Sequence, residues 1–165
     1  MKKYEFTGET KEIRLLFRTA TLHRIRATVA FGIVEVGDLG GWIEKEENLS
    51  HEGKAWVWGN AKVCGDAKVC GDAEVCGDAE VFSASHVLVI GAIGSRNDFT
   101  TFYRDKDNEI TVKCGCFLGK IDRFLEKVTQ THGDSKYALV YRAAVEVAKL
   151  QIDLSGEAPK DADEE

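Results

Sequence analysis

The sequence predicts a mainly β protein whose centre is a short, three-sided parallel coil of repeated strands. Within residues 55–93 an aliphatic residue returns every six positions, a small residue precedes it by two, and Gly followed by Asn or Asp closes four of the units. The aliphatic residues are Val57, Val63, Val69, Val75, Val81, Val87 and Ile93, and the small residues are Ala55, Ala61, Ala67, Ala73, Ala79, Ser85 and Gly91.

Each unit of the repeat is typical of a very short strand, Ala-x-Val-x, that ends in a turn. Alternation along the strand places Ala and Val on one face and the charged residue and Cys on the other. Glycine accepts the unusual backbone angles of a corner, and Asn or Asp tolerates them while bonding the local backbone. A helix is excluded because a Gly-Asp pair every six residues would break it.

Three such units close a triangular coil with Val and Ala inside. The pattern resembles the hexapeptide repeat of left-handed parallel β-helices, which occurs in many acyltransferases. On such a coil Cys64, Cys70 and Cys76 point outward in three directions. They cannot meet at one metal ion, whose ligands must all lie within about 2.3 Å of it. We therefore expect the repeated cysteine to shape the fold, packed at a neighbouring element or interface, rather than to form a site.

The flanking segments predict caps for so short a coil, and the chain divides into four parts. We expect an N-terminal β cap over residues 1–50, the β-helix over 51–93, a C-terminal module over 94–152 and a disordered acidic tail over 153–165. In the C-terminal module, 98–104 and 109–116 read as a β-hairpin. Residues 120–133 and 134–152 have the apolar spacing of two amphipathic helices.

Residues 21–90 resemble the start of bacterial and phage β-solenoid proteins that are loosely described as hexapeptide transferases. The most specific letters are Gly-Asp-Leu-Gly-Gly-Trp-Ile-Glu at 37–44 and Asn-Leu-Ser at 48–50. The C-terminal module resembles phage-encoded proteins of unassigned activity at 94–98, 114–117 and 132–133. These resemblances imply the fold and a phage or prophage origin, and they bring no reaction with them.

Composition narrows the classes of function. Of the net charge of −6, the tail from Asp153 onward supplies −5, so the remainder has no basic excess and nucleic-acid binding gains little support. No apolar run is long enough to span a membrane, and the N-terminus lacks a secretory signal, which predicts a cytoplasmic protein. The five cysteines are then expected as reduced thiols.

Two groups of residues are candidates for binding a ligand or partner. The loop after the repeat gathers polar side chains that suit a phosphate or carboxylate, with an arginine as bidentate donor. Its members are Ser95, Arg96, Asn97, Asp98, Thr100 and Arg104. Trp56 and Trp58 flank Val57 and are expected on the outer face as an exposed aromatic pair at an interface. The alternative for the loop is a polar connection that satisfies its own backbone.

A second set of residues are candidates for a metal site or for a catalytic base. Cys114, Cys116 and His132 could supply three metal ligands, although the thiols could equally pack in a core and no fourth ligand is evident. His86, with His51 second, is the best candidate for the general base that the resembled acyltransferases use. An outward histidine could equally be a solvated substitute for the Lys or Glu of other repeats.

The leading hypothesis is a non-enzymatic, self-associating binding protein that needs no cofactor. A host protein or a small anionic ligand is the expected partner, and an anti-defence role would suit such a protein. The competing hypothesis is a hexapeptide-repeat acyltransferase that acts as an oligomer.

Overall fold

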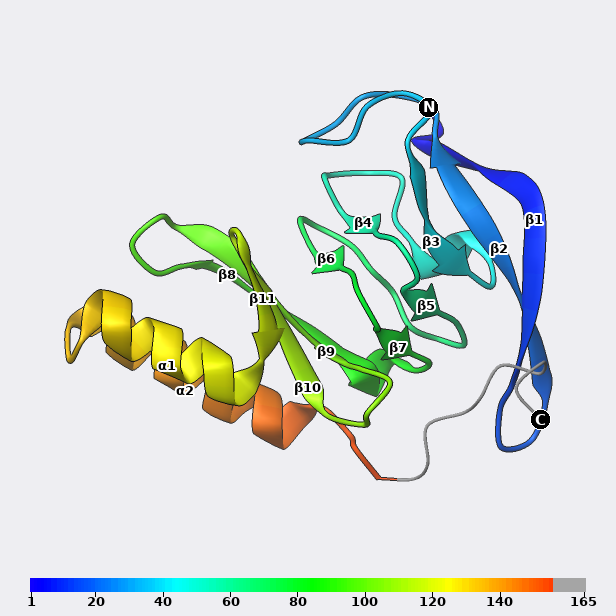
Figure 1. The fold of residues 1–165 in the computed structure, drawn as a ribbon. Helices are drawn as coiled ribbons and strands as arrows, with labels where there is room; N and C mark the ends of the chain where they lie inside the picture. The colour runs from blue at the N-terminus through cyan, green and yellow to red at the C-terminus, as the bar shows by residue number, and fades with distance from the viewer. Residues whose placement is uncertain (156–165) are drawn as a thin grey trace.

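The computed structural model describes residues 1–155 and shows, in this part of the chain, three β-sheets and two α-helices (Figure 1). The strands are β1 (Tyr4–Arg14), β2 (Thr19–Ala27), β3 (Leu39–Ile43), β4 (Trp56–Val57), β5 (Lys62–Val63), β6 (Glu74–Val75), β7 (Glu80–Val81), β8 (Val87–Ile93), β9 (Asp98–Arg104), β10 (Ile110–Cys114) and β11 (Phe117–Lys120). Helix α1 spans Ile121–His132 and α2 spans Lys136–Gln151. Most of the predicted acidic tail lies outside the described residues.

The predicted left-handed parallel β-helix is wrong as the fold class. The repeat strands divide between a five-stranded mixed sheet, in the order β1-β2-β3-β5-β7, and a two-stranded parallel sheet, β4-β6. The third sheet is antiparallel, in the order β11-β10-β9-β8. Strands of two residues form few ladder hydrogen bonds, so the long β1–β2 hairpin and the β8–β11 sheet contribute most of the pairing.

The repeat nevertheless sets the register of the short parallel strands. Lys62 pairs with Glu80 and Trp56 pairs with Glu74, so each ladder joins residues three repeats apart. β3 joins the same ladder through Trp42, which pairs with Lys62. The segment predicted as a cap therefore continues the larger sheet, and Tyr4 and Val34 of this segment pack against the repeat core.

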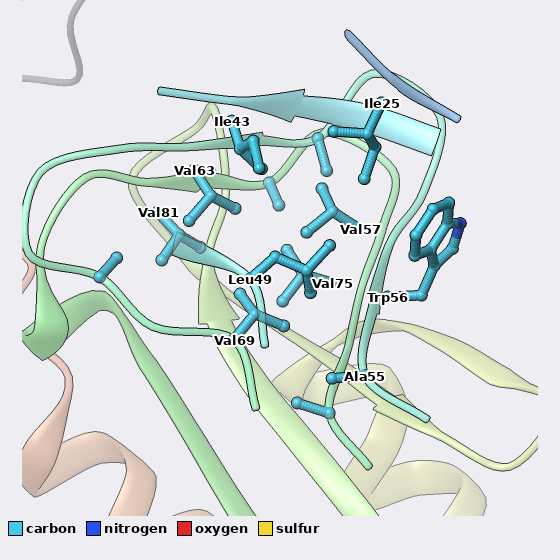
Figure 2. Close-up of a cluster of buried hydrophobic side chains, with 14 of the residues drawn as sticks. Ile25, Ile43, Leu49, Ala55, Trp56, Val57, Val63, Val69, Val75 and Val81 are labelled. Atoms are coloured by element: carbon cyan, nitrogen blue, oxygen red, sulfur yellow. The ribbon is translucent and has the colours of Figure 1, made fainter. Parts of the chain in front are cut away.

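The apolar face of the repeat forms the first core (Figure 2). Its five valines are fully buried, at positions 57, 63, 69, 75 and 81. Ile25 and Ile43 reach this core from β2 and β3. Each buried side chain of this size stabilises the fold by roughly 1.5–3 kcal/mol, so the stacked valines hold the short strands together where ladder hydrogen bonds are few.

The β8–β11 sheet lies between this core and the helices. Val87 and Val89 of β8 pack with Tyr103 of β9 against the repeat core. Leu88 of β8 and Phe102 of β9 pack instead against a second core formed with α1 and α2. The period-2 alternation of a strand thus gives one sheet two apolar faces. No helix of the described residues is long and apolar enough to cross a membrane.

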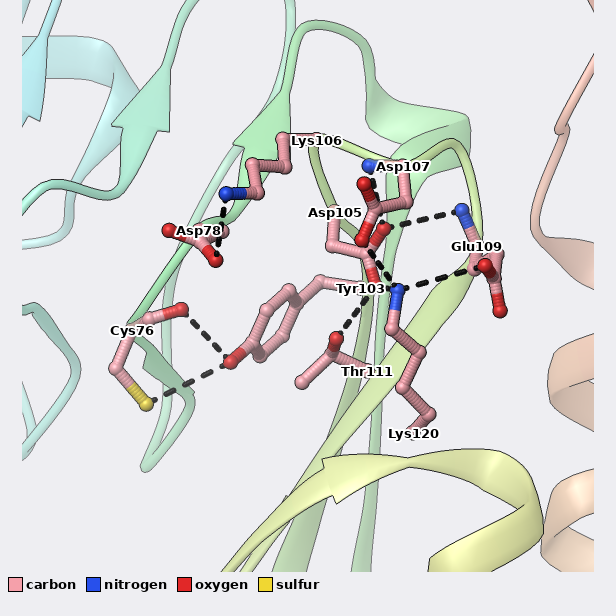
Figure 3. Close-up of polar contacts among 9 residues, drawn as sticks. All are labelled: Cys76, Asp78, Tyr103, Asp105, Lys106, Asp107, Glu109, Thr111 and Lys120. Atoms are coloured by element: carbon pink, nitrogen blue, oxygen red, sulfur yellow. Dashed lines mark hydrogen bonds and ion pairs between the residues drawn. The ribbon is translucent and has the colours of Figure 1, made fainter.

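A polar network joins the sheet to the repeat (Figure 3). The hydroxyl of Tyr103 donates to the carbonyl of Cys76 over 2.8 Å. The buried carboxylate of Asp105 accepts hydrogen bonds from the Thr111 hydroxyl, at 2.7 Å, and from the Lys120 ammonium, at 3.1 Å. This last contact fixes the residue before α1 and so orients the helix against the sheet.

Asn48 is the polar anchor of the N-terminal half. Its side chain is fully buried, its amide donates to the carbonyls of Gly65 and Ala67, and its oxygen accepts the N–H of Lys45. Replacing it with alanine removes all three hydrogen bonds, and leaving the buried carbonyl of Ala67 without a partner costs about 1–3 kcal/mol by itself.

We therefore expect Asn48→Ala to lower the free energy of unfolding by at least about 2 kcal/mol, as measured by chemical denaturation. Asn60→Ala is the matched control because Asn60 is exposed in a repeat turn, and it should change the free energy by less than about 0.5 kcal/mol. Equal losses in the two variants would contradict this account.

Candidate functional site

Two groups of residues that the sequence singled out separately lie around one cavity. Ser95, Arg96 and Asp98 come from the β8–β9 turn and the start of β9. Cys114 and Cys116 come from the β10–β11 turn on the other side. His132, the last residue of α1, lines the same cavity. We call this space, of about 170 Å³, the Arg96 cavity.

The Arg96 cavity has an apolar wall and a basic rim. Phe117, Phe124 and Val128 form the wall, and the last two of these belong to the buried core under α1. Arg96 and Lys127 bring positive charge to the lining, and both side chains are exposed. An apolar space with a few polar groups at its edge is the usual form of a small-molecule site.

Tyr141 of α2 lies under the β8–β9 turn because Gly94 leaves room for it. Gly94 has a φ of 76°, and a Cβ there would overlap the phenol oxygen of Tyr141. Burial raises the pKa of Tyr141, the nearby Cys114 thiol raises it further, and Arg96 acts in the opposite direction. The tyrosine is thus a neutral hydrogen-bonding group in the lining at every physiological pH.

The two exposed cations of the cavity are unpaired. Neither Arg96 nor Lys127 has a hydrogen bond or ion pair with any described residue. Asp98 also lines the cavity and brings one negative charge against these two positive charges, and one of its carboxylate oxygens accepts the N–H of Phe99 at 2.7 Å. The rim therefore carries positive charge that is available to a ligand.

A second, larger space adjoins the first and shares Asp98, Gly115 and Cys116 with it. This groove, of about 530 Å³, is lined by the loop at 31–34, by Glu74 of β6 and by residues 98–99, 113 and 115–116 of the β8–β11 sheet and its turn. Trp58 is half-buried along it. Its carboxylates and lysines are mixed, with Lys113 paired to Glu74 at 3.6 Å, so it lacks the unpaired cations of the Arg96 cavity.

Several residues predicted to bind lie elsewhere. Arg104 is buried, and its Nε donates to the carbonyl of Glu80 at 3.0 Å. Thr100 is buried and donates to the Cys114 thiol at 3.4 Å. Asn97 is exposed in the β8–β9 turn, where its N–H donates to the carbonyl of Gly94 and its side chain does not line the cavity. The exposed aromatic pair is also wrong, because Trp56 is fully buried in the repeat core.

The cysteines occupy unlike surroundings. Cys64 is buried beside Trp42, Cys76 is buried against Tyr103, and Cys70 is exposed. Burial raises the pKa of Cys64 to about 12, which keeps this thiol protonated and inert. Across residues 1–155, no three His, Cys, Asp or Glu side chains are grouped so that they could hold a metal ion. Cys114, Cys116 and His132 therefore share a cavity without forming such a group.

The candidate bases are both engaged in structural hydrogen bonds. Nδ1 of His86 accepts the N–H of Phe82 at 3.0 Å, and Nδ1 of His51 accepts the N–H of Lys3 at 3.0 Å. Each neutral ring then carries its proton on Nε2 and has no free lone pair with which to remove a proton from a substrate. Burial, with a smaller effect of the Arg104 cation, lowers the pKa of His86 to about 4. The geometry does not favour acyl transfer through either histidine.

No protein-family model matches the chain, and neither does any curated protein sequence.

Sequence reasoning missed the residues that the helices contribute to the cavity. The sequence predicts Phe124, Lys127 and Val128 only as parts of an amphipathic helix. Phe124 and Val128 lie on the buried face of this helix, and all three line the cavity. Lys127 lies next to that face and at the level of the cavity. A cation beside the apolar face was the available signal, and Arg123, four residues earlier, shows the same pattern without lining the cavity. Such a pattern is common on helices with no site.

The contact between Gly94 and Tyr141 gives a prediction. Gly94→Ala must displace the tyrosine as well as strain the backbone, and overpacking of this kind adds about 1–3 kcal/mol. Gly133→Ala is the matched control, since Gly133 has a φ of 58° but open space around its Cβ position. Denaturation should show a larger loss of stability for Gly94→Ala than for Gly133→Ala, and the reverse order would refute the contact.

The depressed pKa of His86 predicts a pH dependence. The unfolded chain binds a proton at this residue near pH 6.5, whereas the folded chain does so only near pH 4, so stability is lost as the pH falls through that window. In His86→Asn the amide oxygen can accept the N–H of Phe82 without titrating. We expect the free energy of unfolding of this variant to decline less between pH 7 and pH 4.5 than that of the wild type. Parallel profiles would show that His86 does not titrate in this window.

Proposed function

We propose that the protein is a binding protein for a small anion with an apolar body, which it holds in the Arg96 cavity. The observation that carries the proposal is the pair of unpartnered cations, Arg96 and Lys127, beside an apolar wall. A carboxylate or phosphate of the ligand pairs with the rim, and its apolar part packs against Phe117 and Phe124.

The size of the cavity limits the apolar part to about one ring. A protein cavity of roughly 150 Å³ holds benzene, and the Arg96 cavity measures about 170 Å³. Arylcarboxylates, aryl phosphates and short acyl carboxylates are the ligand classes of this size. A larger ligand would extend into the adjoining groove past Asp98 and Cys116.

The expected affinity is modest. Burial of one ring contributes roughly 2–3 kcal/mol at about 25 cal/mol per Å². Each hydrogen bond to a charged group contributes about 1.5–3 kcal/mol. After the cost of association, dissociation constants of the order of micromolar to millimolar follow. Because the rim is exposed, the affinity should fall as ionic strength rises.

The histidines considered as general bases lie outside the Arg96 cavity and are engaged elsewhere. His51 and His86 use their Nδ1 atoms in backbone hydrogen bonds, and burial keeps the hydroxyl of Tyr141 protonated. The groups that face the Arg96 cavity can hold and orient an anion, and the proposal needs no proton transfer.

The test is titration with phenyl phosphate and benzoate, followed by calorimetry and by backbone amide shifts. We expect both anions to shift amides of residues 95–98 and 114–116, and benzyl alcohol of similar size to bind at least tenfold more weakly. Arg96→Gln should weaken binding of phenyl phosphate by about 10- to 100-fold, since it removes a charged hydrogen bond.

Arg123→Gln is the matched control for this measurement. Arg123 is an exposed arginine on α1 that does not line the cavity, so its replacement should change the affinity less than twofold. Equal binding of benzyl alcohol and benzoate, or equal losses in the two arginine variants, would defeat the proposal.

A further inference from the structure

Two cysteines flank Gly115 in the β10–β11 turn, and both line the Arg96 cavity. Cys114 is half-buried, since its thiol accepts a hydrogen bond from the Thr100 hydroxyl at 3.4 Å and packs against the helix core. Cys116 is exposed, and its thiol has no hydrogen bond with any described residue. Cys116 is therefore the thiol that a molecule in the cavity can reach.

Cys116 lies where the Arg96 cavity meets the adjoining groove. Both spaces are lined by Asp98, Gly115 and Cys116, so a ligand that occupies the two spaces lies against this thiol, with one part on each side. A small disulfide consists of two halves joined by the bond that a thiolate attacks. The position of the thiol between two spaces fits a molecule of that form.

Arg96 lies against the same turn. One terminal nitrogen of its guanidinium, Nη1, would be 3.7 Å from a Cβ atom at Gly115. A cation next to a thiol favours the thiolate, which is the nucleophile, and a guanidinium also pairs with carboxylates. Lys127 brings a second positive charge to the lining, and Asp98 opposes it with one negative charge. The charge around the thiol therefore favours an anionic reaction partner.

We propose that Cys116 is a covalent attachment site for small disulfides that bear carboxylates. The inference rests on the proposed function, because Arg96 holds the carboxylate of the disulfide as it holds that of any other anion. The Cys116 thiolate attacks one sulfur of the disulfide, a new S–S bond forms, and the old S–S bond breaks. The other half leaves as a thiolate and takes up a proton from water. The Cys116 sulfur is oxidised and the leaving sulfur is reduced, so the disulfide itself is the oxidant.

The mixed disulfide controls access to the Arg96 cavity. The attached half keeps its carboxylate beside Arg96 and its apolar part beside Phe117, so it occupies the space that a free anion needs. A reducing thiol reverses the exchange and empties the cavity. The binding of anions at this site then depends on the redox state of the solution.

Cys70 provides an internal control for the reaction. It is the other exposed cysteine among the five, all of which lie in the described part of the chain, and it lines neither space. The reduced full chain is treated with dithiobis-nitrobenzoate, which is anionic, or with dithiodipyridine, which is neutral. Peptide mass spectrometry then gives the rate at each cysteine. The ratio of the rates at Cys116 and Cys70 cancels the different reactivities of the two reagents, and we expect it to be at least about tenfold higher for the anionic reagent.

Two variants test the role of Arg96 and of the adduct. Arg96→Gln should lower the rate at Cys116 by about tenfold with the anionic reagent and by a smaller factor with the neutral one. Arg123→Gln, whose side chain does not line the cavity, should leave both rates unchanged. The wild type that carries the adduct should bind phenyl phosphate at least about tenfold more weakly than the reduced protein, with recovery in dithiothreitol. Cys116→Ser treated in the same way should keep its affinity.

Equal ratios for the two reagents would overturn the proposal, and so would faster modification of Cys70 or Cys114 than of Cys116. An adduct on Cys116 that leaves the affinity for phenyl phosphate unchanged would overturn the control of the cavity. These results are distinct from failure of the proposed function. If phenyl phosphate binds the reduced protein but the ratios are equal, the thiol site alone fails. If the ratios differ and depend on Arg96 while neither phenyl phosphate nor benzoate binds, the reversible site fails and the covalent one stands.

Discussion

The open strands at the end of the repeat have to be covered, and β9 with the loop after it covers them. β6 and β7 are the last short strands of their sheets and would leave free backbone groups next to the core. The Thr101 hydroxyl accepts the N–H of Glu74, the Tyr103 hydroxyl donates to the carbonyl of Cys76, and Arg104 donates to the carbonyl of Glu80. Side chains thus replace the strand that the repeat does not supply.

This contact determines where the rest of the C-terminal half lies. One face of the β8–β11 sheet is occupied by the repeat core, so α1 and α2 can pack only on the other face. The turns β8–β9 and β10–β11 then meet at one end of the sheet, above the last turns of α1. The Arg96 cavity arises at this meeting point, and β8 is left at the free edge.

The sequence predicts local features well and their arrangement poorly. The helices predicted at 120–133 and 134–152 agree with α1 and α2, and the predicted strand at 98–104 agrees with β9. The fold class is wrong because the repeat strands divide between two sheets. The last predicted repeat is wrong because Val87 and Ile93 keep the six-residue spacing although no Gly-Asp turn lies between them. Without those corners, 87–93 runs on as one strand and pairs antiparallel with β9. The aliphatic spacing alone could not distinguish a seventh repeat from a longer strand.

For the candidate site, too, the sequence shows the individual residues but not which of them lie together. Arg96 and Asp98 are noticeable in the sequence, and so are Cys114 and His132, but only the sheet brings the two sets to one cavity. Conversely, the residue types of Arg104 and Trp56 suggest binding, but both side chains are buried in the fold. Residue type alone does not show that Arg104 will donate to the carbonyl of Glu80 or that Trp56 will lie in the core.

Several polar side chains of this protein are committed to the backbone, whereas the cations of the Arg96 cavity are not. Lys3 is buried with its ammonium 2.6 Å from the carbonyl of Ala55, and burial lowers its pKa to about 8. Asn48 and His86 are likewise committed to backbone partners. Moving any of these to a ligand would leave a buried backbone group unpaired, at a cost of about 1–3 kcal/mol. Arg96 and Lys127 carry no such cost, since they pair with no described residue. A ligand can therefore engage these two cations without weakening the fold, which supports the proposal of an anion-binding site at the Arg96 cavity.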